Sequence, residues 1–106
     1  MKIVTTPTIE GYKVTKVIGV VSGSTVRAKN VGRDIIAAFK NLVGGEITEY
    51  TQLLGQSREE ALSRMISKAE GMDANAVINL RFMTSMVSQA ASEILAYGTA
   101  VVVEKQ

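Results

Sequence analysis

The chemistry open to this chain must use oxygen-bearing or cationic side chains, because its 106 residues include no cysteine and no histidine. Disulfides, thiolate metal sites and redox chemistry are therefore excluded, as are Ser-His and Cys-His nucleophile pairs. A metal site would need a hard cation such as Mg²⁺ or Ca²⁺, since soft heavy metals prefer thiolate or imidazole ligands. The acidic side chains considered for such a site are Glu46, Glu49, Asp34, Glu59, Glu60 and Asp73.

Glu46 and Glu49 are spaced so that they share one face at the start of a helix. Acidic side chains in a first turn complement the helix dipole, so we interpret this pair as a solvated cap rather than a metal site. No pattern places two carboxylates across a cleft, as paired-carboxylate hydrolysis requires. We therefore predict no catalytic residues, no metal ligands and no cofactor, and we expect a protein that is not an enzyme.

Arg81 is the centre of a polar cluster, with Asn79 and Thr84-Ser85 nearby, on a strand that is otherwise apolar. An arginine there could hold an anion, but we favour an ion pair between subunits with a helix glutamate. For Arg33 and Asp34 a capping or interface role is likewise favoured over ligand binding. The residues predicted to contact a ligand or a second subunit are Arg33, Asp34, Glu46, Tyr50, Arg81, Ser85 and Tyr97.

The stretch GVVSGST, residues 19–25, invites comparison with a phosphate-binding loop. A Walker loop needs four residues between its glycines and a lysine after the second, whereas here three residues intervene and no lysine follows. Glycine weakens a strand unless something approaches it closely. We therefore predict that Gly19 and Gly23 let a helix or a subunit approach the strand.

The charge balance and the hydropathy of the chain argue against nucleic acid and membrane partners. The 12 Lys and Arg against 10 Asp and Glu give a net charge of +2, without the clustered basic residues of a nucleic-acid surface. No apolar run approaches the roughly 20 residues that span a bilayer, and no signal peptide is recognisable. The expected compartment is the cytoplasm.

Hydrophobic periodicity predicts strands and helices within a single domain over residues 1–106. The strands are expected at 12–26, 76–86 and 93–104, the helices at 30–43 and 46–72, a connection at 87–92, and an edge segment or arm at 1–11. The apolar stripe of the second helix keeps its phase across Gly55, which predicts one long helix. On its solvent side, Glu60 and Arg64 form a favourable i,i+4 pair.

These elements predict an α+β fold, a two-layer β-α-β-β arrangement with the helices on one face of an antiparallel sheet. The strand order is first, last, second. The alternation blurs around Lys16 and Val17, which fits a bulge or a strand buried on both faces near Val17 to Val21. The last strand is apolar on both faces, yet a single helical layer covers only one. Exposure of the other face would create an apolar patch typical of an interface, so we expect a homo-oligomer. The residues on that face are Leu95, Tyr97, Val101 and Val103.

Four stretches together resemble the YbjQ-like family of small bacterial and archaeal proteins: VGRDIIAAFKNLVGGEITEYTQLL, SREEALSRM, DANAVINLRF and ASEILAYGTAVVV. The resemblance covers essentially the whole chain. It implies a dodecin-subunit-like fold assembled as a homopentamer, in a family often labelled heavy-metal-binding. This chain has no cysteine or histidine that could bind a soft metal as the label suggests. The resemblance implies no catalytic residues in this chain. A small-ligand protein is favoured, with a carboxylate metal-binding protein or an enzyme with a composite inter-subunit site as alternatives.

Overall fold

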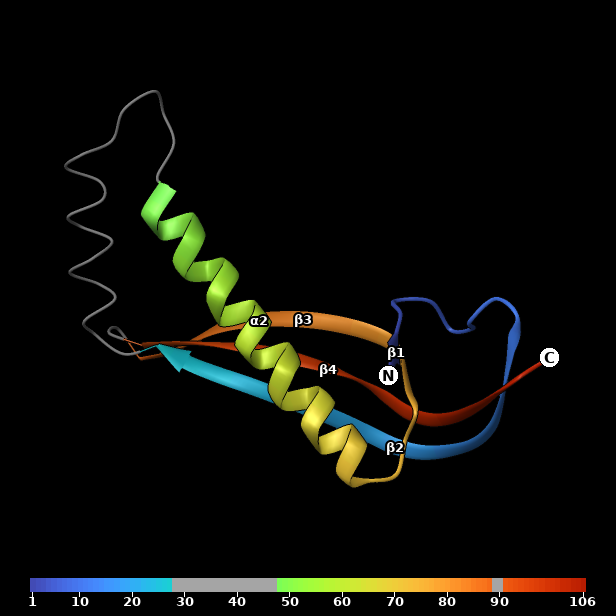
Figure 1. Ribbon diagram of the computed structural model, residues 1–106. Coiled ribbons are helices and arrows are strands. Elements are labelled where there is room, and N and C mark those ends of the chain that lie inside the picture. The colour runs from blue at the N-terminus through green and yellow to red at the C-terminus, as the bar shows by residue number, and fades with distance from the viewer. Residues whose placement is uncertain (28–47, 89–90) are drawn as a thin grey trace.

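The structure of the protein is a computed structural model that describes residues 1–27, 48–88 and 91–106 (Figure 1). The predicted helix at 30–43 lies outside the described residues. The described elements, in chain order, are β1 (Lys2–Ile3), β2 (Tyr12–Arg27), α2 (Thr48–Gly71), β3 (Ala76–Ser88) and β4 (Ala91–Lys105).

The sheet has four strands in the order β1-β3-β4-β2, with β4 paired antiparallel to both β2 and β3. This confirms the predicted order of the three long strands. The antiparallel pairing of these three strands is also as predicted, and β1, which runs parallel to β3, makes the complete sheet mixed. The N-terminal segment therefore pairs with its own sheet. Its backbone continues along β3, where Val4 N donates to Val77 O at 3.0 Å and Leu80 N donates to Val4 O at 3.0 Å.

α2 is one continuous helix of 24 residues that passes through Gly55, as the phase of its apolar stripe predicts. It lies across one face of the sheet (Figure 1). The side chains of Ala61, Met65 and Ala69 are fully buried at successive i,i+4 positions. The helix ends where Asp73 adopts a positive φ of 65°, and the chain turns into β3.

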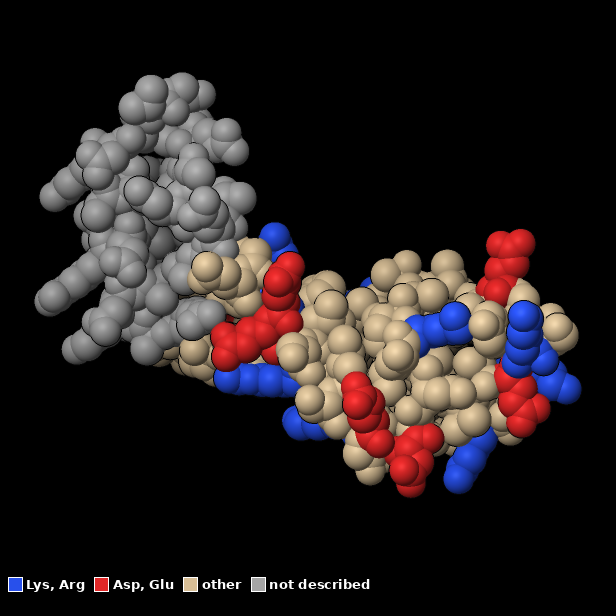
Figure 2. Space-filling model, viewed as in Figure 1, with Lys and Arg blue, Asp and Glu red and all other residues tan. Residues whose placement is uncertain are grey.

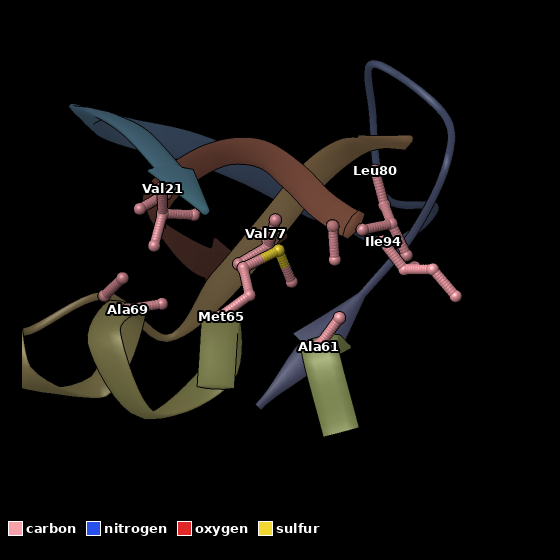
Figure 3. Close-up of a cluster of buried hydrophobic side chains, with 10 residues drawn as sticks. Val21, Ala61, Met65, Ala69, Val77, Leu80 and Ile94 are labelled. Carbon is pink, nitrogen blue, oxygen red and sulfur yellow. The ribbon is translucent and has the colours of Figure 1, made fainter. Parts of the chain in front are cut away.

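The main core lies between α2 and the sheet, and Figure 3 shows Met65 reaching from the helix toward Val77. Gly23 of β2 permits this packing. A Cβ at position 23 would lie 2.8 Å from the carbonyl carbon of Arg64 and would also meet the amide nitrogen of Met65. The core residues are Val21, Ala61, Met65, Ala69, Ala74, Val77, Leu80, Ile94, Ala96 and Ala100.

The helix does not approach Gly19, since a Cβ there would meet nothing within 4 Å in this chain, and approach of a second subunit at this position stays a prediction. The φ of 149° at Gly19 and the register shift between Val17 and Gly19 place this residue at an irregularity of β2. A second shift lies between Val14 and Lys16. Of the two alternatives left open for this part of the strand, the structure therefore has the bulge, and the exposed Val17 and Val20 exclude burial on both faces within the chain. The glycine here accommodates a backbone bend that other residues rarely adopt.

β3 changes phase at Asn79, which the predicted strict alternation did not include. Asn79 has a φ of 55°, and the register with β4 shifts between Ile78 and Arg81. As a result Leu80 packs with Val77 against the helix, whereas the alternation placed it on the face of Ile78. The predicted connection at 87–92 is also wrong in part, because β3 extends to Ser88 and β4 begins at Ala91.

A second, smaller core lies on the face of the sheet away from α2. It consists of Ala76, Ile78, Val101 and Val103, and it is covered by Val4, Ile9 and Tyr12 of the N-terminal part of the chain. The prediction that Val101 and Val103 need a second subunit to cover them is therefore wrong. Leu95 and Tyr97, which precede Val101 in β4, are only half-buried. In the part of the chain that the structure describes, no helix is long and apolar enough to cross a membrane.

Candidate functional site

An apolar surface is left open on the side of the sheet that α2 does not cover. Its most exposed members come from β2: Val17 is 66% and Val20 is 79% exposed. Val17 lies opposite Val101 and Val20 opposite Thr99 in the antiparallel register, so both project from the face away from the helix. We call this surface the open sheet face. Its residues are Val17, Val20, Val26, Met83, Leu95 and Tyr97.

Three of the predicted site residues lie on this side of the sheet: Tyr97 belongs to the open sheet face, and Arg81 and Ser85 lie beside it. Arg81 pairs with Tyr97 across β3 and β4, and Ser85 pairs with Glu93 farther along the same two strands. Positions 81 and 85 are both exposed, and Tyr97 is half-buried. The pairing therefore places a guanidinium, a phenol and a hydroxyl at the margin of an apolar surface.

Arg81 also has contacts within its own chain that the sequence did not reveal. Its Nη1 donates to Thr5 O at 2.8 Å and to Leu80 O at 2.8 Å. The first of these bonds joins β3 to the N-terminal segment that covers the second core. The side chain thus fastens that segment at the border of the open sheet face.

The other predicted site residues cannot be placed with these three. Three of them, Arg33, Asp34 and Glu46, lie outside the described residues. Tyr50 lies in α2, but the structure describes only its backbone. Within the described ranges, no group of three or more Asp, Glu, His or Cys side chains is placed to hold a metal ion. Among the described residues, the open sheet face is therefore an apolar surface with one guanidinium, Arg81, and one carboxylate, Glu93, beside it.

A second candidate site lies between α2 and the edge strand β2. It is a groove of about 480 Å³ lined by Ser24, Ser63, Arg64, Ser67 and Lys68. The predicted pair of Glu60 and Arg64 is confirmed at its border, with Nη2 of Arg64 2.7 Å from Oε1 of Glu60. Sequence reasoning missed the groove, although the i,i+4 spacing of Ser63 with Ser67 and of Arg64 with Lys68 is a signal for one polar helix face.

Charged side chains of both signs are interspersed over the described part of the surface in view in Figure 2. That side of the molecule presents no broad field of a single sign, which is what a nucleic-acid interface requires. Among the described residues, the open sheet face groups exposed apolar side chains and the groove beside α2 groups Arg64 with Lys68.

The comparisons with known proteins agree with one another over nearly the whole chain. A family model described as "Putative heavy-metal-binding" matches residues 1–104. The chain is 54% identical over 101 residues to a UPF0145 protein of Methanosarcina acetivorans, which covers 95% of each chain. It is 57% identical over 104 residues to a UPF0145 protein of Clostridioides difficile, with 98% of this chain and 93% of the relative covered.

The fold is similar to that of a crystal structure of a protein of unknown function from Pediococcus pentosaceus, described as belonging to the DUF74 family. The two share a TM-score of 0.64 at 21% sequence identity, and the similarity covers 98% of each chain. This likeness supports the α+β architecture of the described elements.

Proposed function

This chain belongs to the UPF0145 family, whose model is described as "Putative heavy-metal-binding", and we propose that it is a non-enzymatic protein that assembles with copies of itself. The assembly binds a small ligand or partner at its subunit interfaces. The observation that carries this proposal is the open sheet face, on which Val17 and Val20 are 66% and 79% exposed. Exposed apolar side chains grouped on one face of a sheet are typical of protein interfaces.

The size of the chain supports the same proposal. With 106 residues it buries only about 60–65% of the surface of its unfolded chain, so association offers a direct gain in buried apolar area. The second core is already covered by the N-terminal segment, which leaves the half of the sheet around Val20, Leu95 and Tyr97 for a neighbouring copy. The family resemblance implies a homopentamer, and that is the assembly we propose.

A neighbouring copy on the open sheet face would adjoin Arg81, Ser85 and Tyr97. Arginine and hydroxyl groups at the rim of an apolar surface recognise a carboxylate or another anionic group. These residues are therefore the ones we assign to the ligand or to the polar contacts between subunits. No proton transfer or nucleophilic step follows from this set, which is why the proposed role is binding.

The residues present do not fit a soft heavy metal. The chain has no cysteine and no histidine, so only methionine thioethers remain as soft ligands. Met65 is fully buried in the core, and the register with β4 places Met83 and Met86 on opposite faces of β3. Two thioethers of one chain are therefore not brought together on this strand. We assign no metal to this protein.

The substitution Val20→Lys tests the proposal, because the side chain is exposed and its loss leaves the core of the chain intact. We expect a smaller particle than the wild type by size-exclusion chromatography with light scattering, since a buried lysine at an interface lacks a partner. Gln56→Lys adds the same charge at an exposed position on α2 and should leave the size unchanged. Equal sizes for all three proteins would contradict assembly through this face.

A further inference from the structure

The residues that line the groove between α2 and β2 are not part of the proposed subunit interface. Its lining contains two cations, Arg64 and Lys68, and the hydroxyl-bearing residues Ser63 and Ser67 of α2. Ser24 of β2 contributes its backbone carbonyl, because its register opposite Leu95 places its side chain on the other face of the sheet. The volume of the groove, about 480 Å³, falls within the range of small-molecule sites. The groove lies on the helix side of the sheet, whereas the open sheet face lies on the other side.

Gly23 fixes the position of the groove. Because it has no side chain, the backbone of α2 near Arg64 and Met65 packs directly on β2. This close approach places the polar face of the helix beside the outer edge of β2, where Ser24 contributes to the lining. The walls of the groove therefore come from two elements whose backbones are in direct contact.

Arg64 is held in a defined orientation at this junction. Its Nη1 donates to Ser24 O at 2.6 Å, and its Nη2 donates to Oε1 of Glu60 at 2.7 Å. A guanidinium has five N–H donors, so these two bonds fix the plane of the group without exhausting its donors. The side chain is 54% exposed and therefore open to a bound molecule.

Lys68 supplies the charge that is not balanced within the groove. It follows Arg64 by one helical turn, and it forms no ion pair with any residue that the structure describes. Glu60 balances the charge of Arg64, so the ammonium of Lys68 gives the groove a net positive charge. Hydroxyl donors on the same helix face are contributed by Ser63 and Ser67.

We infer that this groove binds a phosphate group, either the free anion or the phosphate of a small ester. Planar arginine donors, an ammonium and hydroxyl groups in one groove match the several acceptor oxygens of phosphate. A carboxylate has two oxygens and one charge and would leave part of this donor set unused. The volume of the groove leaves room for an organic group beyond the phosphate, and that group would lie against α2 and the edge of β2.

The test is a titration of the full-length ¹⁵N-labelled protein at constant ionic strength, followed by TROSY NMR. The probes are glycerol 3-phosphate, inorganic phosphate and acetate. We expect saturable shifts of the amides of Ser63, Arg64, Ser67 and Lys68 with the phosphate probes and weaker binding of acetate. Tighter binding of glycerol 3-phosphate supports an ester as the natural ligand, and equal affinity of inorganic phosphate supports the free anion.

The decisive variant is Lys68→Gln, which removes the unbalanced charge and retains a polar side chain. We expect it to weaken glycerol 3-phosphate binding about tenfold, the usual loss for one charge-assisted hydrogen bond. Lys16→Gln, at an exposed position of β2 outside the groove, should leave the affinity unchanged. Because Lys68 lies in the last turn of α2, where a cation stabilises the helix, thermal unfolding of both variants verifies that they are folded.

Several outcomes would overturn the inference. Acetate binding as tightly as the phosphate probes would exclude phosphate recognition. Shifts that do not saturate, or that spread over many lysines, would show only nonspecific ion binding. Equal affinities of Lys68→Gln and Lys16→Gln for glycerol 3-phosphate would show that the groove is not the binding site. None of these results depends on the number of subunits.

Discussion

Gly23 of β2 and Met65 of α2 are in direct contact through the backbone, since a Cβ at position 23 would meet the amide nitrogen of Met65. This contact sets the distance between the helix and the sheet. The main core and the groove beside α2 both depend on that distance, because Met65 lies in the core and Arg64, the preceding residue, lines the groove.

Gly23→Ala is therefore expected to destabilise the fold, since the added methyl group must displace helix backbone rather than a flexible side chain. Overpacking of this kind typically costs about 1–3 kcal/mol. Urea unfolding followed by circular dichroism measures the loss. Gly55→Ala is the control: a Cβ there meets nothing within 4 Å, and alanine in a helix interior is favoured over glycine by about 1 kcal/mol. A Gly23→Ala variant as stable as the wild type would refute the close contact.

Arg81→Ala is expected to weaken assembly, seen as a later elution in size-exclusion chromatography. The guanidinium donates to Thr5 O at 2.8 Å and so holds the N-terminal segment beside the open sheet face. Loss of the bond should loosen the segment that covers Val101 and Val103. Arg58→Ala removes an exposed arginine from α2 and serves as the control. An unchanged elution volume for Arg81→Ala would instead favour a ligand-binding role for this residue.

Titration calorimetry with Zn²⁺, Cu²⁺ or Cd²⁺ should show no binding at micromolar affinity or tighter. The reason is the absence of cysteine and histidine from the whole chain, together with the absence of a metal-binding acidic cluster within the described ranges. Titration of the same metal into buffer without protein provides the baseline. Stoichiometric heat at micromolar metal would show that the family description applies to this chain after all.

The features predicted well from the sequence are those set by local pattern. α2 continues through Gly55 because its apolar stripe keeps a helical period on both sides of that residue, and the cost of one glycine is small beside the burial of Ala61 and Met65. The sequence of β4 is apolar on both faces, which is typical of a strand inside a sheet rather than at its edge. In the structure β4 lies between β3 and β2.

The features that were missed depend on conformation and on distant contacts. The phase change in β3 rests on the positive φ of Asn79, and asparagine adopts that conformation too rarely for the pattern alone to reveal it. The cover over Val101 and Val103 comes from Val4 and Ile9, about 100 residues away along the chain. No short-range pattern encodes such a pairing.

The candidate sites were predicted unevenly for the same reason. The pairing of Arg81 with Tyr97 follows from the register of β3 and β4, which the bulge at Asn79 shifts. The groove could not be derived from α2 alone, because its second wall is the edge of β2 at Ser24. The glycine that brings the two walls together was recognised, but which element approaches it was left open between a helix and a subunit.

Native mass spectrometry of the purified protein is the most direct test of the central claim, because it reports the number of chains and any retained small molecule together. We predict a single dominant species with the mass of five 11.4 kDa chains. A clean monomer at micromolar concentration would contradict the account, since the open sheet face would then be left uncovered in solution.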